Sequence, residues 1–143
     1  MGEIRAKIHL QNQEDIILYK KGFIKKEEVR ETTIDALVDT GAVMVLLPQD
    51  VVEQLGLTIV DKTVATLAND EKVELNIAEE FVINICGRRW ITDCLVGPPL
   101  CEPLIGQLVM ERLDLVLNPR KKTITVNPAS PYLPHLKLKA INH

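Results

Sequence analysis

A single acid at the end of an apolar run is the first place where this sequence could do chemistry. Residues 36–42 read Ala-Leu-Val-Asp-Thr-Gly-Ala, so a buried strand would deliver Asp39 onto a turn marked by Gly41. A carboxylate beside a buried strand is costly unless it is hydrogen-bonded, and the Thr40 hydroxyl and nearby backbone N–H groups could hold it. Asp39 is therefore a candidate acid–base group, although a strand-ending Asx turn would use the same residues.

The elements that must position Asp39 are expected to be mostly strands. Aromatic residues make up only 3% of the 143, so Val, Ile and Leu must build the core, and these residues favour strands. The segments with strand patterns are 3–10, 16–19, 29–38, 43–47, 58–67, 72–86, 89–96, 115–117 and 123–126. Short helices are predicted over 48–57, with Pro48 at the first helical position, and over 107–113. These elements predict a mostly β single domain with a small closed or barrel-like sheet.

Composition and charge indicate which partners to expect. The formal charge is −3, which gives no reason to expect nucleic acid or an acidic membrane surface as a partner. Paired basic residues such as Lys20-Lys21 and Lys25-Lys26 are expected to be solvated turns. The first residues contain no apolar h-region, position 6 is Ala6 rather than Ser or Thr, and no apolar run is long enough to span a membrane. We therefore expect a cytoplasmic protein.

The three cysteines do not indicate a metal site or a disulfide framework. Cys86, Cys94 and Cys101 are odd in number and form no C-x-x-C spacing, and the three histidines are scattered. Cys86 and Cys94 fall in strand patterns and are expected to be small buried hydrophobes. A Cys–His nucleophile pair stays open, but nothing in the local sequence supports it. No metal or other cofactor is predicted.

Asp39-Thr40-Gly41-Ala42 after an apolar strand resembles the active-site motif of retropepsin-like (retroviral-type, clan AA) aspartic proteases. Leu104-Ile105-Gly106 before a helix is similar to the second signature of that family, and residues 66–71 occupy the place of its flap hairpin. The resemblance covers about residues 34–126 and is closest to the cellular and bacterial members. It implies a closed small β-barrel of the acid-protease type. The chain departs from the family in having Gln107 after the second glycine and no glycine in the flap turn.

The resemblance also implies roles for individual residues. Asp39 would be catalytic, and Thr40 and Gly41 would support the active-site loop. Val45 is a further apolar candidate for a side-chain pocket, with core packing as its alternative. The residues implied to bind substrate are Ala42, Leu67, Ala68, Asn69, Asp70, Leu104, Ile105 and Gly106.

Aspartic protease chemistry requires two carboxylates that share one water, yet this chain holds one Asp-Thr-Gly. The sequence therefore predicts a homodimer that contributes Asp39 from each copy and hydrolyses extended peptide substrates. One alternative is a non-catalytic dimeric peptide-binding or interaction module with the same fold. Another is a β-barrel interaction domain unrelated to proteases.

The proposed domain organisation is a protease domain over residues 1–126 and a proline-spaced tail over 127–143. Pro128, Pro131 and Pro134 space the tail, and a terminal strand could follow over 136–141. Three arrangements stay open for it: an added strand in the dimer sheet, a cover over the cleft, or disorder.

Overall fold

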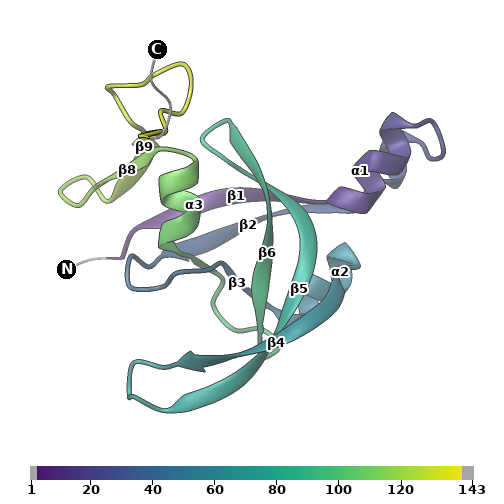
Figure 1. The fold of residues 1–143 in the computed structure, drawn as a ribbon, viewed down its shortest axis with the longest axis horizontal. Helices are drawn as coiled ribbons and strands as arrows, with labels where there is room; N and C mark the ends of the chain where they lie inside the picture. Colours follow the sequence, from purple (N-terminus) through teal and green to yellow (C-terminus); the bar gives the residue numbers. More distant parts are fainter. Residues whose placement is uncertain (1–2, 140–143) are drawn as a thin grey trace.

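A ring-closed, mixed β-sheet with three short α-helices forms the body of the protein in a computed structural model that describes residues 3–139 (Figure 1). The strands are β1 (Arg5–Asn12), β2 (Glu31–Val38), β3 (Leu46–Pro48), β4 (Thr58–Thr66), β5 (Lys72–Ile85), β6 (Arg88–Gly97), β7 (Leu104–Ile105), β8 (Leu115–Asn118) and β9 (Thr123–Val126). The helices are α1 (Gln13–Lys20), the 3-10 turn η1 (Lys26–Glu28), α2 (Gln49–Leu55) and α3 (Gln107–Arg112).

Seven strands lie in the order β1-β2-β7-β3-β6-β5-β4, and an additional pairing of β1 with β5 closes six of them into a ring. The β2–β7 and β3–β6 pairs are parallel, while the hairpins are antiparallel. β4 pairs only with β5, so the β4–β5 hairpin extends beyond the ring. The predicted mostly β domain with a closed sheet is confirmed, with one more α-helix than expected.

The core fills the ring because the strands alternate in polarity. Ala6, Ile8 and Leu10 of β1 are buried, while the residues between them are more exposed. Each fully buried Ile or Leu contributes about 1.5–3 kcal/mol relative to an exposed one. Helices α2 and α3 add one apolar face each, with Val51, Val52, Leu55, Val109, Met110 and Leu113.

The strand predicted over 16–19 is wrong, because these residues lie in helix α1. Asn12 caps the helix, since its side-chain oxygen accepts a hydrogen bond from the Asp15 N–H at 3.0 Å. At the other end Gly22 has φ +81°, and the Gly22 and Phe23 N–H groups donate to the carbonyls of Tyr19 and Leu18. This Schellman-type stop and the N-cap together favour a helix over the strand that the apolar run suggested.

Four further predictions differ from the structure. Cys86, expected to be buried in a strand, is exposed and follows the end of β5 at Ile85. The strand predicted over 43–47 is shortened to β3, because residues 43–44 bend to contact the start of α3. Pro48 is the N-cap of α2 rather than its first helical residue. The tail forms no strand over 136–139, and residues 140–141 of the predicted terminal strand lie outside the described residues.

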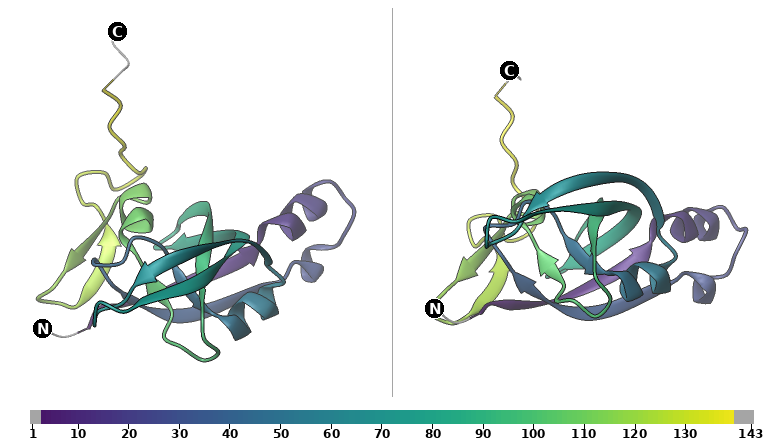
Figure 2. Two further views of the ribbon diagram at one scale, coloured as in Figure 1. Left: turned by 60° about the horizontal axis from the view of Figure 1, so that its bottom comes forward. Right: turned by 90° about the horizontal axis from the view of Figure 1, so that it is seen from below.

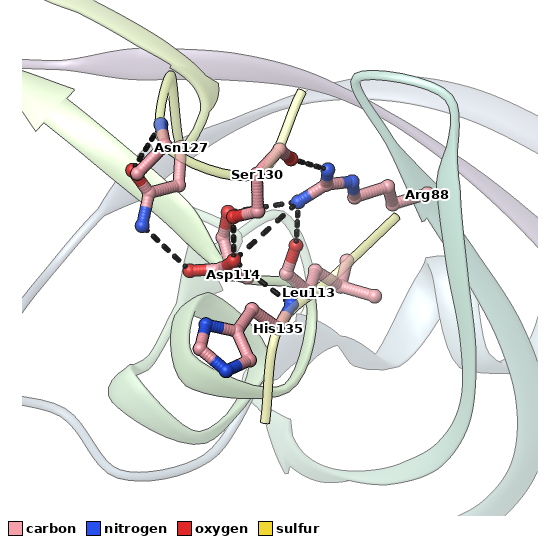
Figure 3. A network of polar contacts seen from close by, with 7 residues as sticks. Arg88, Leu113, Asp114, Asn127, Ser130 and His135 are labelled. Atoms are coloured by element: carbon pink, nitrogen blue, oxygen red, sulfur yellow. Dashed lines mark hydrogen bonds and ion pairs between the residues drawn. The ribbon is translucent and has the colours of Figure 1, made fainter. Parts of the chain in front are cut away.

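A polar network attaches the tail to the body (Figure 3). Arg88, which is buried, donates to the carbonyls of Leu113 at 2.9 Å and Asp114 at 3.0 Å, and also to that of Ser130. The Asp114 carboxylate accepts from the Ser130 hydroxyl, from the His135 N–H at 3.0 Å and from Asn127 at 3.1 Å. These donors, Ser130 first, lower the pKa of Asp114 to about 2. Residues 127–135 are therefore fixed beside α3, and the chain then leaves the body (Figure 2).

Helix α1 and the loop after it project from one end of the molecule, whereas β8 and β9 lie at the other end (Figures 1 and 2). Within residues 3–139, no helix has the length and apolarity needed to cross a membrane.

Candidate active site

Asp39 follows directly on β2, and its backbone is fixed by the neighbouring strand β7. The Leu37 N–H donates to the Pro103 carbonyl at 2.9 Å, and the Asp39 N–H donates to the Ile105 carbonyl at 3.0 Å. The two segments pair in parallel, although 66 residues separate Leu37 from Pro103. The two motifs that the sequence singled out are thus brought side by side by main-chain hydrogen bonds.

The start of α3 holds the loop over residues 39–44 through main-chain hydrogen bonds. The Gln107 N–H donates to the Ala42 carbonyl at 2.8 Å, and the Leu108 N–H donates to the Val43 carbonyl at 3.2 Å. Gly106 lies against this loop so closely that a Cβ there would be 2.6 Å from the Val43 carbonyl carbon and oxygen. Any residue can adopt the φ of −96° found at Gly106. Glycine is therefore required at this position because the backbone of the 39–44 loop lies so close, not because of the backbone conformation.

The Asp39 carboxylate is half-buried and is oriented by its own loop. One oxygen, Oδ1, accepts from the Gly41 N–H at 2.9 Å, and the Asp39 carbonyl accepts from the Ala42 N–H at 3.1 Å. The Asx turn considered from the sequence is therefore present. The second oxygen, Oδ2, makes no hydrogen bond with any residue in the described range 3–139. One oxygen is held in place while the other can bind water or a substrate.

A cleft of about 760 Å³ lies between this loop and the β4–β5 hairpin. Its lining is mostly apolar, and Asp39 is the one ionisable side chain in it among the residues that the structure describes. Six lining residues were predicted as site residues: Asp39, Gly41, Ala42, Leu67, Ala68 and Leu104. The sequence analysis did not place the other nine in the site, namely Val43, Met44, Leu46, Thr63, Val64, Ala65, Thr66, Leu75 and Leu95.

Four of the predicted substrate-binding residues do not line this cleft. Ile105 is fully buried in the core, and Gly106 is buried under the 39–44 loop. Asn69 and Asp70 lie in the turn at the tip of the hairpin, where the Asn69 side chain accepts from the Glu71 N–H at 3.0 Å. Val45 is 1% exposed and packs in the core, which was its alternative role. The alternation of β4 could have indicated Thr63 and Ala65, since period-2 residues share a face.

The turn at the hairpin tip is closed without glycine. The Leu67 N–H donates to the Glu71 carbonyl at 2.8 Å, and the Asp70 N–H donates to the Leu67 carbonyl at 3.0 Å. Asp70 takes φ +66°, a left-handed conformation that Asp tolerates better than most residues do. The absence of glycine from the tip is therefore compatible with a tight hairpin.

Thr40 lines a different hollow from the cleft that contains Asp39. Its side chain is exposed and makes no hydrogen bond within the described part of the chain, so the hydroxyl support predicted for Asp39 is absent. A second hollow of about 500 Å³ begins at Thr40 and is lined by Gln107, Met110, Glu111, Asp114, Leu115, Val116 and Leu117. The Asp39 loop thus separates two hollows.

Comparison with known protein families gives one match. Residues 26–83 match the model of a family described as aspartyl protease. Over these residues the chain is similar to the aspartyl protease family. The match includes the Asp39 loop, α2 and the β4–β5 hairpin, and it ends within β5. A comparison with curated proteins found none that matches the chain.

The aspartyl protease match ends before β7 and Gly106, so these elements are related to the family segment by the structure alone. Their hydrogen bonds to Leu37, Asp39 and Ala42 make them part of the same loop assembly.

Proposed function

We propose that this chain is a homodimeric aspartic endopeptidase in which two Asp39 side chains, one from each copy, activate a water molecule. The observation that carries the proposal is a single half-buried carboxylate in the wall of an apolar cleft, in a segment similar to the aspartyl protease family. A chain with one such carboxylate supplies half of the chemistry, and two-fold association would supply the other half.

The reaction requires the two carboxylates to share one proton, because like charges about 3 Å apart do not both ionise. The ionised Asp39 takes a proton from water as the water oxygen bonds to the scissile carbonyl carbon. The protonated Asp39 gives its proton to the carbonyl oxygen. When the tetrahedral species collapses, the Asp39 that took the water proton gives it to the amine nitrogen as the C–N bond breaks. The other Asp39 takes a proton from a hydroxyl of the tetrahedral carbon, so a carboxylic acid and an amine leave, the shared proton is restored and no covalent enzyme intermediate forms.

The geometry supports an extended peptide as the substrate. A peptide between the 39–44 loop and β4 could add as a strand to backbone groups of the hairpin, since β4 pairs with β5 alone. The apolar lining from Val43, Met44, Leu75 and Leu95 favours apolar side chains on either side of the bond cut.

The second copy would dock on the side of the loop where Thr40 is exposed. The hollow between Thr40, Gln107 and β8 shares no lining residue with the cleft, and β8 and β9 form a two-stranded sheet of their own. Such an isolated hairpin is marginal by itself and gains from added partners. We also propose a cytoplasmic location, which stays a prediction from the sequence.

The test is cleavage of a peptide library from acid to neutral pH by the wild type, Asp39→Asn and Asp35→Asn. Asp35 is an exposed acid on β2, four residues before Asp39, so its amide variant is a matched control. We expect Asp39→Asn to lose cleavage and Asp35→Asn to keep it. Retained cleavage in a clean Asp39→Asn preparation would exclude the mechanism. Dimers that bind peptides without cutting them would support the non-catalytic module instead.

A further inference from the structure

The projection formed by α1 and the following loop carries an apolar tip flanked by lysines in the sequence. Phe23 is 75% exposed, and Leu18 and Tyr19 on α1 are 40% and 41% exposed. Residues 17–26 contain four lysines, all exposed, and no acid: Lys20, Lys21, Lys25 and Lys26. We refer to residues 17–26 as the tip segment. Residues 17–19 of this segment were expected in a strand, and they lie in helix α1 with side chains about 40% exposed.

The tip segment stands on a fixed base. Asp15, which is buried, accepts from the Arg30 side chain at 2.8 and 3.0 Å and from the Arg30 N–H at 3.0 Å. Asn12 donates to the Leu55 carbonyl at 2.7 Å, which ties the helix start to α2. Ile16, Val29 and Val82 form a small second core beneath the helix. Phe23 is thus exposed on an element whose base is fixed by hydrogen bonds and packing.

Charge is distributed unevenly between the tip segment and the rest of the chain. Because the whole chain carries −3 and the tip segment carries +4, the rest carries −7. Glu27 and Glu28, which follow the tip segment in η1, are exposed, so residues 17–28 together carry +2 and the remainder carries −5. None of the four lysines makes an ion pair with any residue that the structure describes. A negatively charged surface would therefore attract the tip segment and repel the rest, which gives a single orientation of approach.

We propose that the tip segment is a docking site for an anionic lipid surface. An exposed apolar side chain with lysines on both sides in the sequence combines the two signals that reversible membrane attachment requires, apolar insertion and attraction to acidic headgroups. Tyr19 suits the headgroup level because its ring is apolar and its hydroxyl is polar. The lysine stems can cover apolar surface while their ammonium groups reach the phosphates. The inference does not depend on proteolysis.

An acidic protein partner is the competing occupant, and the shape of the site favours lipid. The tip segment is a narrow projection at one end of the molecule, whereas stable protein interfaces bury about 800 Å² on each partner (Figures 1 and 2). A narrow convex tip can enter a fluid headgroup layer without a complementary groove. The expectation of no membrane partner rested on the net charge of the chain, and a net charge does not show that the lysines are concentrated in the tip segment.

The experiment is sedimentation of the full chain with vesicles, using Asp39→Asn in parallel so that proteolysis plays no part. Vesicles of phosphatidylcholine alone are compared with vesicles containing about 30% phosphatidylserine at about 0.15 M salt. One variant is Phe23→Ser, and another changes the four tip lysines to Gln. The matched control, Leu100→Ser with Lys121→Gln and Lys122→Gln, removes an exposed apolar side chain and exposed lysines outside the tip segment.

We expect the wild type to bind the anionic vesicles only. Partitioning should be weakened by on the order of tenfold in Phe23→Ser and by more in the lysine variant. The control should bind as the wild type does. Absence of wild-type binding, or equal binding by all variants, would overturn the proposal. So would binding of a poly-glutamate peptide that depends on the lysines but not on Phe23, which identifies an acidic protein as the partner. Loss of self-association in Phe23→Ser would instead assign the tip to a contact between copies.

Discussion

Gly106→Ala is expected to displace the Asp39 loop while leaving the ring intact. The added Cβ would lie 2.6 Å from the Val43 carbonyl carbon and oxygen and 2.7 Å from the Met44 carbonyl oxygen. These neighbours are backbone atoms, so no side-chain rotation relieves the contact. Since Cβ contacts below 3.0 Å essentially never occur, the loop and α3 must separate by about 0.4 Å or more.

The separation acts on the hydrogen bonds that hold the loop. The bonds from Gln107 and Leu108 to the carbonyls of Ala42 and Val43 span this gap and must lengthen or bend. Inserting one methyl group into a packed site costs about 1–3 kcal/mol of unfolding free energy. A displacement of 1 Å at a reacting group costs about a hundredfold in rate, so a smaller shift at Asp39 should reduce kcat by about tenfold or more.

The assay pairs urea unfolding with peptide cleavage for Gly106→Ala and for Gly87→Ala. Gly87 lies in the β5–β6 turn with φ +79° and nothing within 4 Å of an added Cβ, so alanine there costs about 1 kcal/mol through backbone strain alone. We expect both variants to be destabilised and only Gly106→Ala to lose kcat. Equal loss of kcat in the two would refute the positioning role of Gly106, and so would full activity of a folded Gly106→Ala.

Three further predictions concern ionisable groups outside the cleft. Asp114→Asn should release the tail, and limited proteolysis between α3 and the C-terminus would detect the release. The pKa of Asp114 is lowered to about 2 from 3.8. Its stabilising effect is therefore present above pH 4 and is lost as the pH falls toward 2, which acid unfolding would measure. Asp15→Asn should lower the unfolding free energy by about 1–2 kcal/mol in urea titrations, because it leaves Arg30 without its charged partner, and retained stability would contradict the bracing role. Burial raises the pKa of Cys94 to about 12, so iodoacetamide at pH 8 should modify Cys94 only after unfolding. The free energy of unfolding should decline as the pH rises above 9, because the thiol ionises first in the unfolded chain.

The strands that alternate in polarity were predictable from the sequence, because burial of one face imposes a period of two. β1 and the start of β5 follow that pattern, and helix α2 lies where Gly56, with φ +65°, can end it. Asp39 at a strand end was also predictable, since an apolar run followed by an acid and a glycine gives few alternatives.

Helix α1 was not predicted because a short apolar run has no distinctive period. Ile16 to Tyr19 read as a strand, but the N-cap at Asn12 and the left-handed Gly22 lie just outside the run and decide the outcome. The tip segment follows from that helix. Its exposure therefore depends on capping residues that are weak signals when the sequence is read alone.

The pairing of β2 with β7 could not be obtained from local pattern. A segment of two residues, Leu104 and Ile105, is too short to specify a strand, and their partners lie 67 residues away. The clamp on the tail is similar, because it depends on a buried Arg88 that reaches three carbonyls from separate segments. Arg88 reads from sequence as a charged turn residue, since Arg is seldom buried.

Mixing of active and inactive chains tests most directly whether two copies of Asp39 form one site. Wild-type protein at a fixed concentration is equilibrated with a threefold excess of Asp39→Asn chains, and peptide cleavage is measured against the same excess of Asp35→Asn. If both carboxylates are required, activity with the Asp39→Asn excess falls to about a quarter of that of wild type alone, because random pairing leaves that share of wild-type chains with a wild-type partner. Activity that is unchanged by the Asp39→Asn excess would show that one Asp39 suffices and would contradict the proposed dyad.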